Sequence, residues 1–528
     1  MSRQARHFVT ARVGRDVGTA TITSMNLSYL RPAHLLLALA ACLLAGCDKL
    51  SRASSPDGTT PSFVECRLKD VDSMARCAMF TVPEDHRSPQ NGKTLNIHVA
   101  VIASLARRAE PDPVYFFAGG PGQAASDLGR IVSALGELRK HRDVVLVDQR
   151  GTGKSKTLTC EDGPDAASAS PGSKADPLLQ MLSATALDME RDRLRCLATL
   201  KGNPALHRTD DFIDDLEAVR KALGHSKINV WGGSYGSRVG LRYLKRFPTS
   251  IRSAVLDGVA PTSLHLPDDA LKSSEAELRG LLAACAASKQ CSKAYPGALA
   301  QFDGLLAKLK AAPERAQVAH PSTGALIPAT IGDRTLVSLL WPLLYQPEAA
   351  RLVPTLIAQA AAGNFAPLAA TATASASATP SDDLAGALRM AVLCAEDMLG
   401  RSASTVPNPR FEAITELFYA ACKDFPHGNV AAEFFEPTVS DIPTLLLSGK
   451  HDPVTPPSQA ELVAKTLSKH KHLVVAGMGH IVSPHPCVRR VLAKFIGDGA
   501  LPAIADSCEA DLNGPLPLFY TSTLEATP

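Results

Sequence analysis

Residues 228–236, Ile-Asn-Val-Trp-Gly-Gly-Ser-Tyr-Gly, constrain the fold of this chain more than any other feature. An apolar strand pattern leads directly into Gly-x-Ser-x-Gly, and residues 237–247 follow with a helical pattern that stops at Pro248. A sharp strand-to-helix turn at this motif strains the backbone of Ser234, and the flanking glycines remove side chains that would collide. The sequence therefore predicts a strand, a tight turn that exposes a serine hydroxyl, and a helix.

Several short apolar runs predict a sheet that is covered by helices on both faces. These runs are residues 114–117, 144–147, 228–231, 254–256, 444–447 and 472–475. Strands that are apolar on both faces are typical of a parallel sheet buried between helices. Helical patterns such as residues 211–223 lie between them, so we predict a doubly wound, mostly parallel α/β sheet. Residues 78–82 and 95–102 flank the turn-rich residues 89–92 and predict a hairpin.

The length of the chain indicates more than one compact core. At 528 residues it exceeds the size at which single cores usually stop growing. We predict a first core part at residues 63–261, a helical cap inserted at 262–436, and a second core part at 437–528. Residues 369–381 are an Ala/Thr/Ser low-complexity segment, for which we predict a mobile loop.

The first 47 residues predict an export signal. An apolar run at residues 35–45 follows Arg31 and ends in Leu-Ala-Gly-Cys47, which resembles the lipobox of bacterial lipoproteins. Eleven or so apolar residues are too few to span a bilayer, which needs about 20, but they suit a signal peptide. We expect a lipid anchor on Cys47, a flexible tether at 48–62, and a periplasmic or cell-surface location on a bacterial membrane. A buried core helix is the alternative interpretation of the apolar run.

The cysteine content agrees with export. If Cys42 leaves with the leader and Cys47 carries lipid, ten of the 12 cysteines remain, an even number. Disulfides persist in oxidising compartments. Sequence alone does not fix their connectivity; the pairing of near neighbours that we expect is Cys66–Cys77, Cys160–Cys196, Cys285–Cys291, Cys394–Cys422 and Cys487–Cys508. A metal site is the rival interpretation, and it lacks the Cys and His spacing of zinc ligands.

Ser234 needs two partners to act as a nucleophile. A serine hydroxyl is a poor nucleophile at neutral pH, so a base must take its proton and a carboxylate must orient that base. In folds with this turn the order along the chain is Ser, acid, His. Asp452 follows the strand pattern at 444–448 and His480 follows the next strand, so both lie at strand carboxyl ends. We predict a Ser234, Asp452 and His480 triad; the nearest competitors are His451, His485 and Asp441.

Five segments of the chain together resemble the prolyl aminopeptidase and tripeptidyl aminopeptidase family of α/β-hydrolases. They are Phe-Ala-Gly-Gly-Pro-Gly at 117–122, Asp-Gln-Arg-Gly-Thr-Gly-Lys-Ser at 148–155, the serine motif at 232–236, Gly-Lys-His-Asp at 449–452 and Gly-His at 479–480. The resemblance extends from about Cys77 to about Cys508 and is weak in the cap. Ala118 replaces the histidine of simple prolyl aminopeptidases, which favours the larger, disulfide-bearing tripeptidyl type.

The resemblance also implies roles for further residues. The backbone N–H groups of Gly120 and Tyr235 are expected to form an oxyanion hole, because amides aimed at developing negative charge stabilise the tetrahedral intermediate. Glu396, shortly after Cys394, is expected to bind the ammonium group of the substrate through a charge-assisted hydrogen bond. A solvated helix face is the alternative for Glu396. Arg150 is expected to brace its loop.

These residues predict an exported aminopeptidase or tripeptidyl peptidase that acts on short peptides. Ser234 attacks the carbonyl, His480 takes and returns the proton, and Asp452 holds the imidazole, with no need for a metal or organic cofactor. A carboxylesterase or lipase is the first alternative, since the same fold and triad serve both chemistries. A non-catalytic binding module is the second, and the complete triad argues against it. The net charge of +3 predicts no nucleic-acid partner.

Overall fold

The structure is a computed structural model that describes residues 61–69, 71–129, 136–155, 157–159, 197–320, 323–378, 385–398, 401 and 412–501. The predicted export signal, Cys47 and most of the predicted tether lie outside these residues. Within the described ranges, no helix is both long and apolar enough to cross a membrane.

One mixed sheet of nine strands runs through the described part of the chain in the order β1-β2-β3-β5-β4-β6-β7-β10-β11. The strands are β1 Val64–Cys66, β2 Ala75–Pro83, β3 Thr94–Ile102, β4 Val114–Phe117, β5 Val144–Val147, β6 Ile228–Gly233, β7 Ile251–Asp257, β10 Thr444–Gly449 and β11 His470–Val475. Pairing is antiparallel from β1 to β5 and parallel from β5 to β11. This confirms the predicted mostly parallel sheet and the predicted β2–β3 hairpin.

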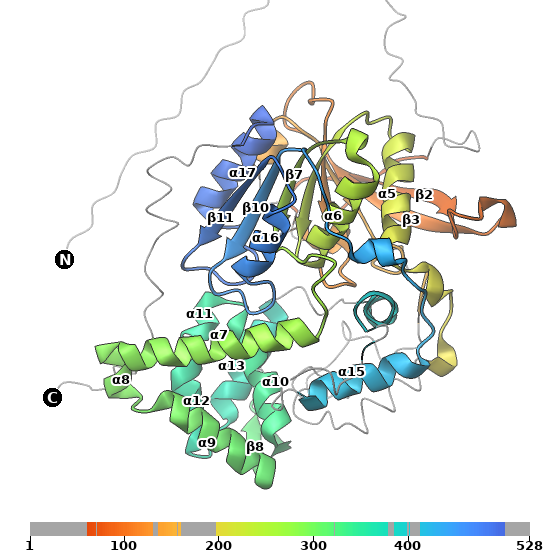
Figure 1. Ribbon diagram of the computed structural model, residues 1–528. Helices are drawn as coiled ribbons and strands as arrows, with labels where there is room; N and C mark the ends of the chain where they lie inside the picture. The colour runs from red at the N-terminus through yellow and green to blue at the C-terminus, as the bar shows by residue number, and fades with distance from the viewer. Residues whose placement is uncertain are drawn as a thin grey trace, which may run out of the picture. The chain divides into compact units, whose positions relative to one another are not determined.

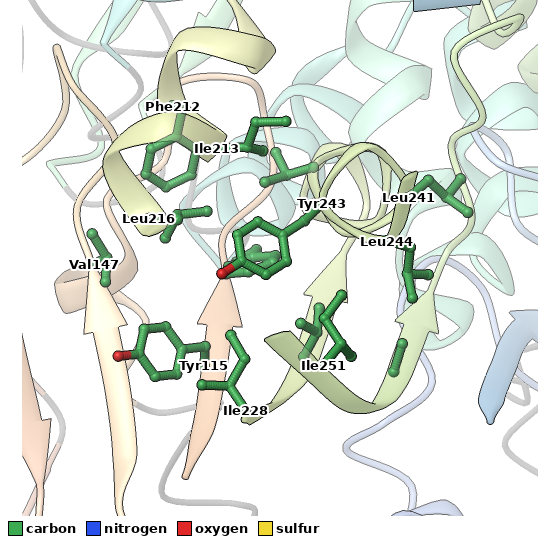
Figure 2. Close-up of a cluster of buried hydrophobic side chains, with 14 of the residues drawn as sticks. Tyr115, Val147, Phe212, Ile213, Leu216, Ile228, Leu241, Tyr243, Leu244 and Ile251 are labelled. Atoms are coloured by element: carbon green, nitrogen blue, oxygen red, sulfur yellow. The ribbon is translucent and has the colours of Figure 1, made fainter. Parts of the chain in front are cut away.

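Helices pack on both faces of this sheet (Figure 1). Helices α5 (Thr209–Ala222), α6 (Tyr235–Arg246) and α16 (Pro457–Ala464) contribute to the core on one face, and α17 (Pro486–Asp498) to the core on the other. Figure 2 shows Leu216 of α5 and Tyr243 of α6 packed over Tyr115 and Ile228 of the strands. The parallel strands are thus buried on both faces, as their apolar sequences require.

A set of mostly helical elements lies between β7 and β10 (Figure 1). We call residues 268–378 the cap; its helices are α7 Asp268–Ala287, α8 Lys289–Ala294, α9 Ala298–Ala311, α10 Asp333–Leu344, α11 Pro347–Ala350, α12 Val353–Ala361 and α13 Ala366–Ala378. Its buried side chains, among them Leu282, Phe302, Leu340 and Ile357, form a core of their own. The chain returns to the sheet through α14 (Gly386–Val392), a π-helical turn (Leu393–Asp397) and α15 (Glu412–Asp424).

Two features of the cap correct the sequence predictions. An antiparallel hairpin of β8 (Glu314–Ala319) and β9 (Leu326–Ile331) interrupts the helices, where we had expected little strand structure. β9 buries alternate residues, but its exposed positions include Leu326 and Pro328, so the sequence lacks the apolar/polar alternation of a half-buried strand. Helix α13 covers most of the predicted mobile loop at 369–381. Alanine is the best helix former, and the small Ala369 and Ala372 are buried in the cap core.

Three of the expected disulfides are present among the described residues: Cys66–Cys77, Cys285–Cys291 and Cys394–Cys422. Cys487 is also disulfide-bonded. Its expected partner Cys508, and the pair Cys160 and Cys196, lie outside the described residues. Disulfides persist in oxidising compartments, so the three observed bonds indicate an extracytoplasmic protein.

Candidate active site

Ser234 occupies the turn between β6 and α6. Its backbone has φ 56° and ψ −126°, a left-handed value that is rare outside glycine. Its N–H donates to the carbonyl oxygen of Asp257 at 2.8 Å, which holds the turn against the end of β7. A Cβ atom at Gly232 would collide with the carbonyl of Gly236, and one at Gly236 with the carbonyl of Phe117. The motif therefore needs glycine on both sides of the serine.

Asp452 and His480 form a hydrogen-bonded pair on the two loops that follow β10 and β11. His480 Nδ1 lies 2.8 Å from Asp452 Oδ2. The same carboxylate accepts hydrogen bonds from the backbone N–H groups of Val454 and Thr455 and from the Thr455 hydroxyl. Because the aspartate is buried and fully bonded, its orientation toward the imidazole is fixed.

The two partners shift each other's pKa in opposite directions. Burial alone would raise the pKa of Asp452, but the His480 charge and the hydrogen bonds to the carboxylate hold it below its usual range. Burial alone would lower the pKa of His480, and the Asp452 charge more than offsets that effect, so the pKa of His480 is raised. The pair thus stabilises a protonated imidazole, which a general base needs after it takes a proton.

The end of β7 brings Ser234 and His480 to the same place. Ser234 is bonded to the Asp257 carbonyl, and a Cβ at the next residue, Gly258, would lie 3.0 Å from His480 Cε1. Ile481 Cδ1 would also lie 3.5 Å from a Cβ at Gly233, directly before the serine. The Ser234 turn and the loop that carries His480 therefore both lie against the carboxyl end of β7.

Asp257 is a residue of this site that the sequence analysis did not predict. Its buried carboxylate accepts hydrogen bonds from the N–H groups of Val482, at 3.0 Å, and Ser483, at 2.7 Å. Between these groups and His480 lies Ile481, a non-glycine residue with φ 69°. Asp257 thus anchors the strained loop that carries His480. An aspartate at the carboxyl end of a buried strand was the available signal.

The loop at residues 117–122 lies against the serine. A Cβ at Gly119 would lie 3.0 Å from Ser234 Cβ, so only glycine fits there without a shift. The Gly119 N–H already donates to Gln123 Oε1 at 3.1 Å. Gly120 follows with φ 107°, and its role as an oxyanion-hole donor stays a prediction.

Tyr235 is held by its side chain while its backbone N–H begins α6. Its hydroxyl lies 2.7 Å from Thr209 Oγ1 and accepts from Gln149 Nε2 at 3.3 Å. N–H groups in the first turn of a helix have no partner within the helix, and the helix dipole favours negative charge there. The position of Tyr235 thus suits the second predicted oxyanion donor.

Glu396 lies in the π-helical turn and is buried, with 1% of the residue exposed. Its carboxylate accepts hydrogen bonds from the N–H and hydroxyl of Thr209, at 2.7 and 2.8 Å. It also lies 3.4 Å from Arg238, which pairs with Asp397 at 3.1 Å. One arginine thus faces two buried carboxylates, and burial raises the pKa of Glu396 to about 7. The solvated helix face considered above is excluded.

This environment bears on the predicted role of Glu396. A substrate ammonium ion would have to displace Thr209 from the carboxylate. The observed bonds instead connect Glu396 through Thr209 to the hydroxyl of Tyr235. Binding of the ammonium by Glu396 therefore stays a prediction, and the burial favours a supporting role beneath the serine turn.

The three competitors for the triad have other surroundings. His451 Nδ1 is bonded to Glu277 of the cap at 2.7 Å. His485 precedes α17, and Asp441 is exposed, with Lys469 3.7 Å away. Arg150 is buried and pairs with Asp215 at 2.6 Å, which ties the loop after β5 to α5 as a brace.

Comparison with known proteins agrees with this geometry. The profile of the α/β hydrolase fold matches residues 112–484. This chain therefore belongs to the α/β-hydrolase fold family, and its Ser, His and Asp set is that of a serine hydrolase.

Among characterised sequences it is related to peptidases. It is 27% identical over 242 residues to serine protease Hip1 of Mycobacterium tuberculosis, covering 42% of this chain and 45% of that one. It is 30% identical over 199 residues to a tripeptidyl aminopeptidase of Streptomyces coelicolor, covering 36% of each chain. It is 30% identical over 191 residues to a proline iminopeptidase of Aeromonas sobria, covering 34% of this chain and 37% of that one. Each match spans less than half of the relative.

Proposed function

We propose that this chain is an exported serine peptidase that releases short N-terminal fragments from peptides. The observation that carries the proposal is the buried Asp452–His480 pair beside the strained Ser234 turn. The peptidase names of the related proteins support the choice of substrate class.

The proposed mechanism is acyl transfer through Ser234, with His480 as the general base and acid. His480 takes the proton of Ser234 as the hydroxyl attacks the carbonyl, and Asp452 stabilises the imidazolium that forms. The N–H groups of Gly120 and Tyr235 bind the oxyanion. His480 then returns the proton to the leaving amine, and water releases the acyl group from Ser234 by the same route.

A substrate panel tests the proposal. Chromogenic tripeptide anilides with a free N-terminus, the same anilides with a blocked N-terminus, and 4-nitrophenyl acetate are compared by kcat/KM. The proposal predicts that the free peptides are the best substrates. Turnover of the ester without any peptide cleavage would instead support the carboxylesterase alternative, and no turnover at all would support a binding module.

We also propose a lipid anchor on Cys47, from the short apolar run and the Leu-Ala-Gly-Cys motif. The three disulfides support an extracytoplasmic location. Cys47→Ala is expected to move the protein from the membrane to the soluble fraction. An unchanged distribution, or an unlipidated Cys47 by mass spectrometry, would refute the anchor.

A further inference from the structure

The buried Nε–H of Arg389, on α14, has no hydrogen-bond partner among the described residues. Guanidinium nitrogens donate hydrogen bonds and cannot accept them. Because an unpaired buried donor is costly, nearly all such groups in proteins find an acceptor. An open donor on a side chain without an ion pair indicates a ligand that brings an acceptor.

Tyr345 places Arg389 and the indole of Trp341 next to the catalytic histidine. Its ring meets the His480 ring edge-on, with centroids 5.5 Å apart and planes at 83°. Burial raises the pKa of Tyr345 to about 12, with the Arg389 cation and a hydrogen bond from the Trp341 indole opposing the rise. Both groups therefore lie close to the Tyr345 hydroxyl. We call Trp341, Tyr345 and Arg389 the donor cluster.

Helix α14 connects this cluster to the loop at residues 117–122. The residue before the helix, Ala385, donates its N–H to the carbonyl of Gly122 at 3.0 Å. Within the helix, Leu388 lies against Gly151, where an added Cβ would be 3.3 Å from Leu388 Cβ. Arg389 thus sits on an element that is fixed to two loops at the carboxyl edge of the sheet.

Arg389, which is partly buried, differs from the buried arginines in its surroundings. Arg150, Arg238 and Arg242 each form an ion pair with an aspartate. Arg389 has no carboxylate within ion-pair distance in the described ranges, and burial lowers its pKa. Arginine stays protonated in proteins, so this side chain carries a positive charge that no neighbouring anion balances.

We propose that Arg389 binds a carboxylate on the leaving-group side of the scissile bond. His480 returns its proton to the leaving group, and the donor cluster packs against that imidazole. A carboxylate satisfies the open Nε–H of Arg389 and balances its charge. The favoured substrates are then short peptides whose free C-terminal carboxylate lies close to the cleaved bond. The inference deepens the proposed hydrolase function and rests on it.

Two matched substrate pairs test this inference with the full chain. One pair is tetra-alanine as the free acid and as the C-terminal amide; the other is 4-acetoxybenzoate and 4-acetoxybenzamide, whose leaving groups differ in one carboxylate. The acid of each pair should have the higher kcat/KM, by roughly 10- to 100-fold, the range of a charge-assisted hydrogen bond. Arg389→Met should remove most of this preference, and Arg389→Lys should retain part of it. Arg315→Met removes an exposed cap arginine and should leave the preference unchanged.

The outcomes separate the two proposals. Equal kcat/KM for acid and amide in the wild type overturns the carboxylate site, even if Arg389→Met fails to fold. Equal loss on acid and amide in a folded Arg389→Met variant also overturns it. If the wild type hydrolyses the esters and neither peptide, the peptidase proposal fails, and the ester pair still decides the role of Arg389.

Discussion

The core side and the cap side of the site use their polar groups in different ways. On the core side, Asp452 and Asp257 are buried carboxylates whose hydrogen bonds are made within the protein. On the segment that returns from the cap, Arg389 Nε has no partner among the described residues. Satisfied groups hold their geometry before substrate arrives, whereas an open donor can still accept a partner from the substrate. The difference agrees with the proposals that place the chemistry on the core side and substrate selection on the cap side.

Removing the nucleophile should abolish catalysis without unfolding the core. Ser234→Ala is expected to lower kcat by roughly a million-fold on peptide and ester alike, because no other group can form the acyl-enzyme. The change removes one hydroxyl and keeps both flanking glycines, so the thermal unfolding midpoint should stay near that of the wild type. An active, folded Ser234→Ala enzyme would remove the serine from the mechanism.

Removing the orienting carboxylate should have the next largest effect. Asp452→Asn is expected to lower kcat by about 10,000-fold, since the imidazole loses the anion that orients it. The pKa of His480 is raised mainly by Asp452, so the acid limb of the kcat/KM profile should also move to lower pH in the variant.

The exposed aspartate 441 provides the matched control. Asp441→Asn should change neither kcat nor the pH profile, because this side chain is exposed and its ion-pair partner, Lys469, is 3.7 Å away. Near-normal activity of Asp452→Asn would place the catalytic acid elsewhere.

Weakening the anchor of the loop that carries His480 should lower kcat less than the loss of Asp452 does. Asp257→Asn keeps the shape of the side chain but leaves its amide facing a backbone N–H, so we expect roughly a 10- to 100-fold loss of kcat on all substrates. Asp257 also helps to raise the pKa of His480, so the acid limb should shift slightly to lower pH. A change in KM for peptides alone would show instead that Asp257 acts on substrate binding.

Glu396→Gln should have the smallest effect on activity. If Glu396 supports Tyr235 through Thr209, peptide and ester hydrolysis should fall equally, by about tenfold or less. Loss confined to peptides with a free N-terminus would instead support binding of the substrate ammonium.

The same variant should alter the pH dependence of stability. Burial raises the pKa of Glu396 to about 7 from an ordinary 4.5, so the native state keeps a proton that the unfolded state releases. This contribution is fully present below pH 4.5 and is lost as pH rises through 7, an effect of roughly 3 kcal/mol. The unfolding midpoint should therefore fall less between pH 5 and 8 in Glu396→Gln than in the wild type. Exposed Glu348→Gln is the control.

The core was largely predictable because its signals are local. Residues 228–231 and 444–447 were predicted as strands, and β6 and β10 extend each by two residues. Strands buried on both faces must be apolar along their whole length, so short sequences identify them. The end of β10 then indicated where Asp452 lies, and the end of β11 indicated where His480 lies.

The cap was less predictable because its elements depend on each other. Ala369 and Ala372 of α13 are buried by packing within the cap core, which no local pattern records. Tyr345 and Arg389 come from distant elements, and each is an ordinary residue in its own segment. Glu396 was singled out by resemblance, but its burial was not foreseen, since most charged side chains are exposed.

The most direct test of the central claim is to locate the activated serine chemically. The full chain is treated with diisopropyl fluorophosphate, digested with trypsin and analysed by mass spectrometry. We predict a single phosphoryl adduct on Ser234, within the peptide of residues 228–238, absent in Ser234→Ala and formed far more slowly in Asp452→Asn. An adduct on another residue, or an unlabelled enzyme that still hydrolyses its substrates, would contradict the account.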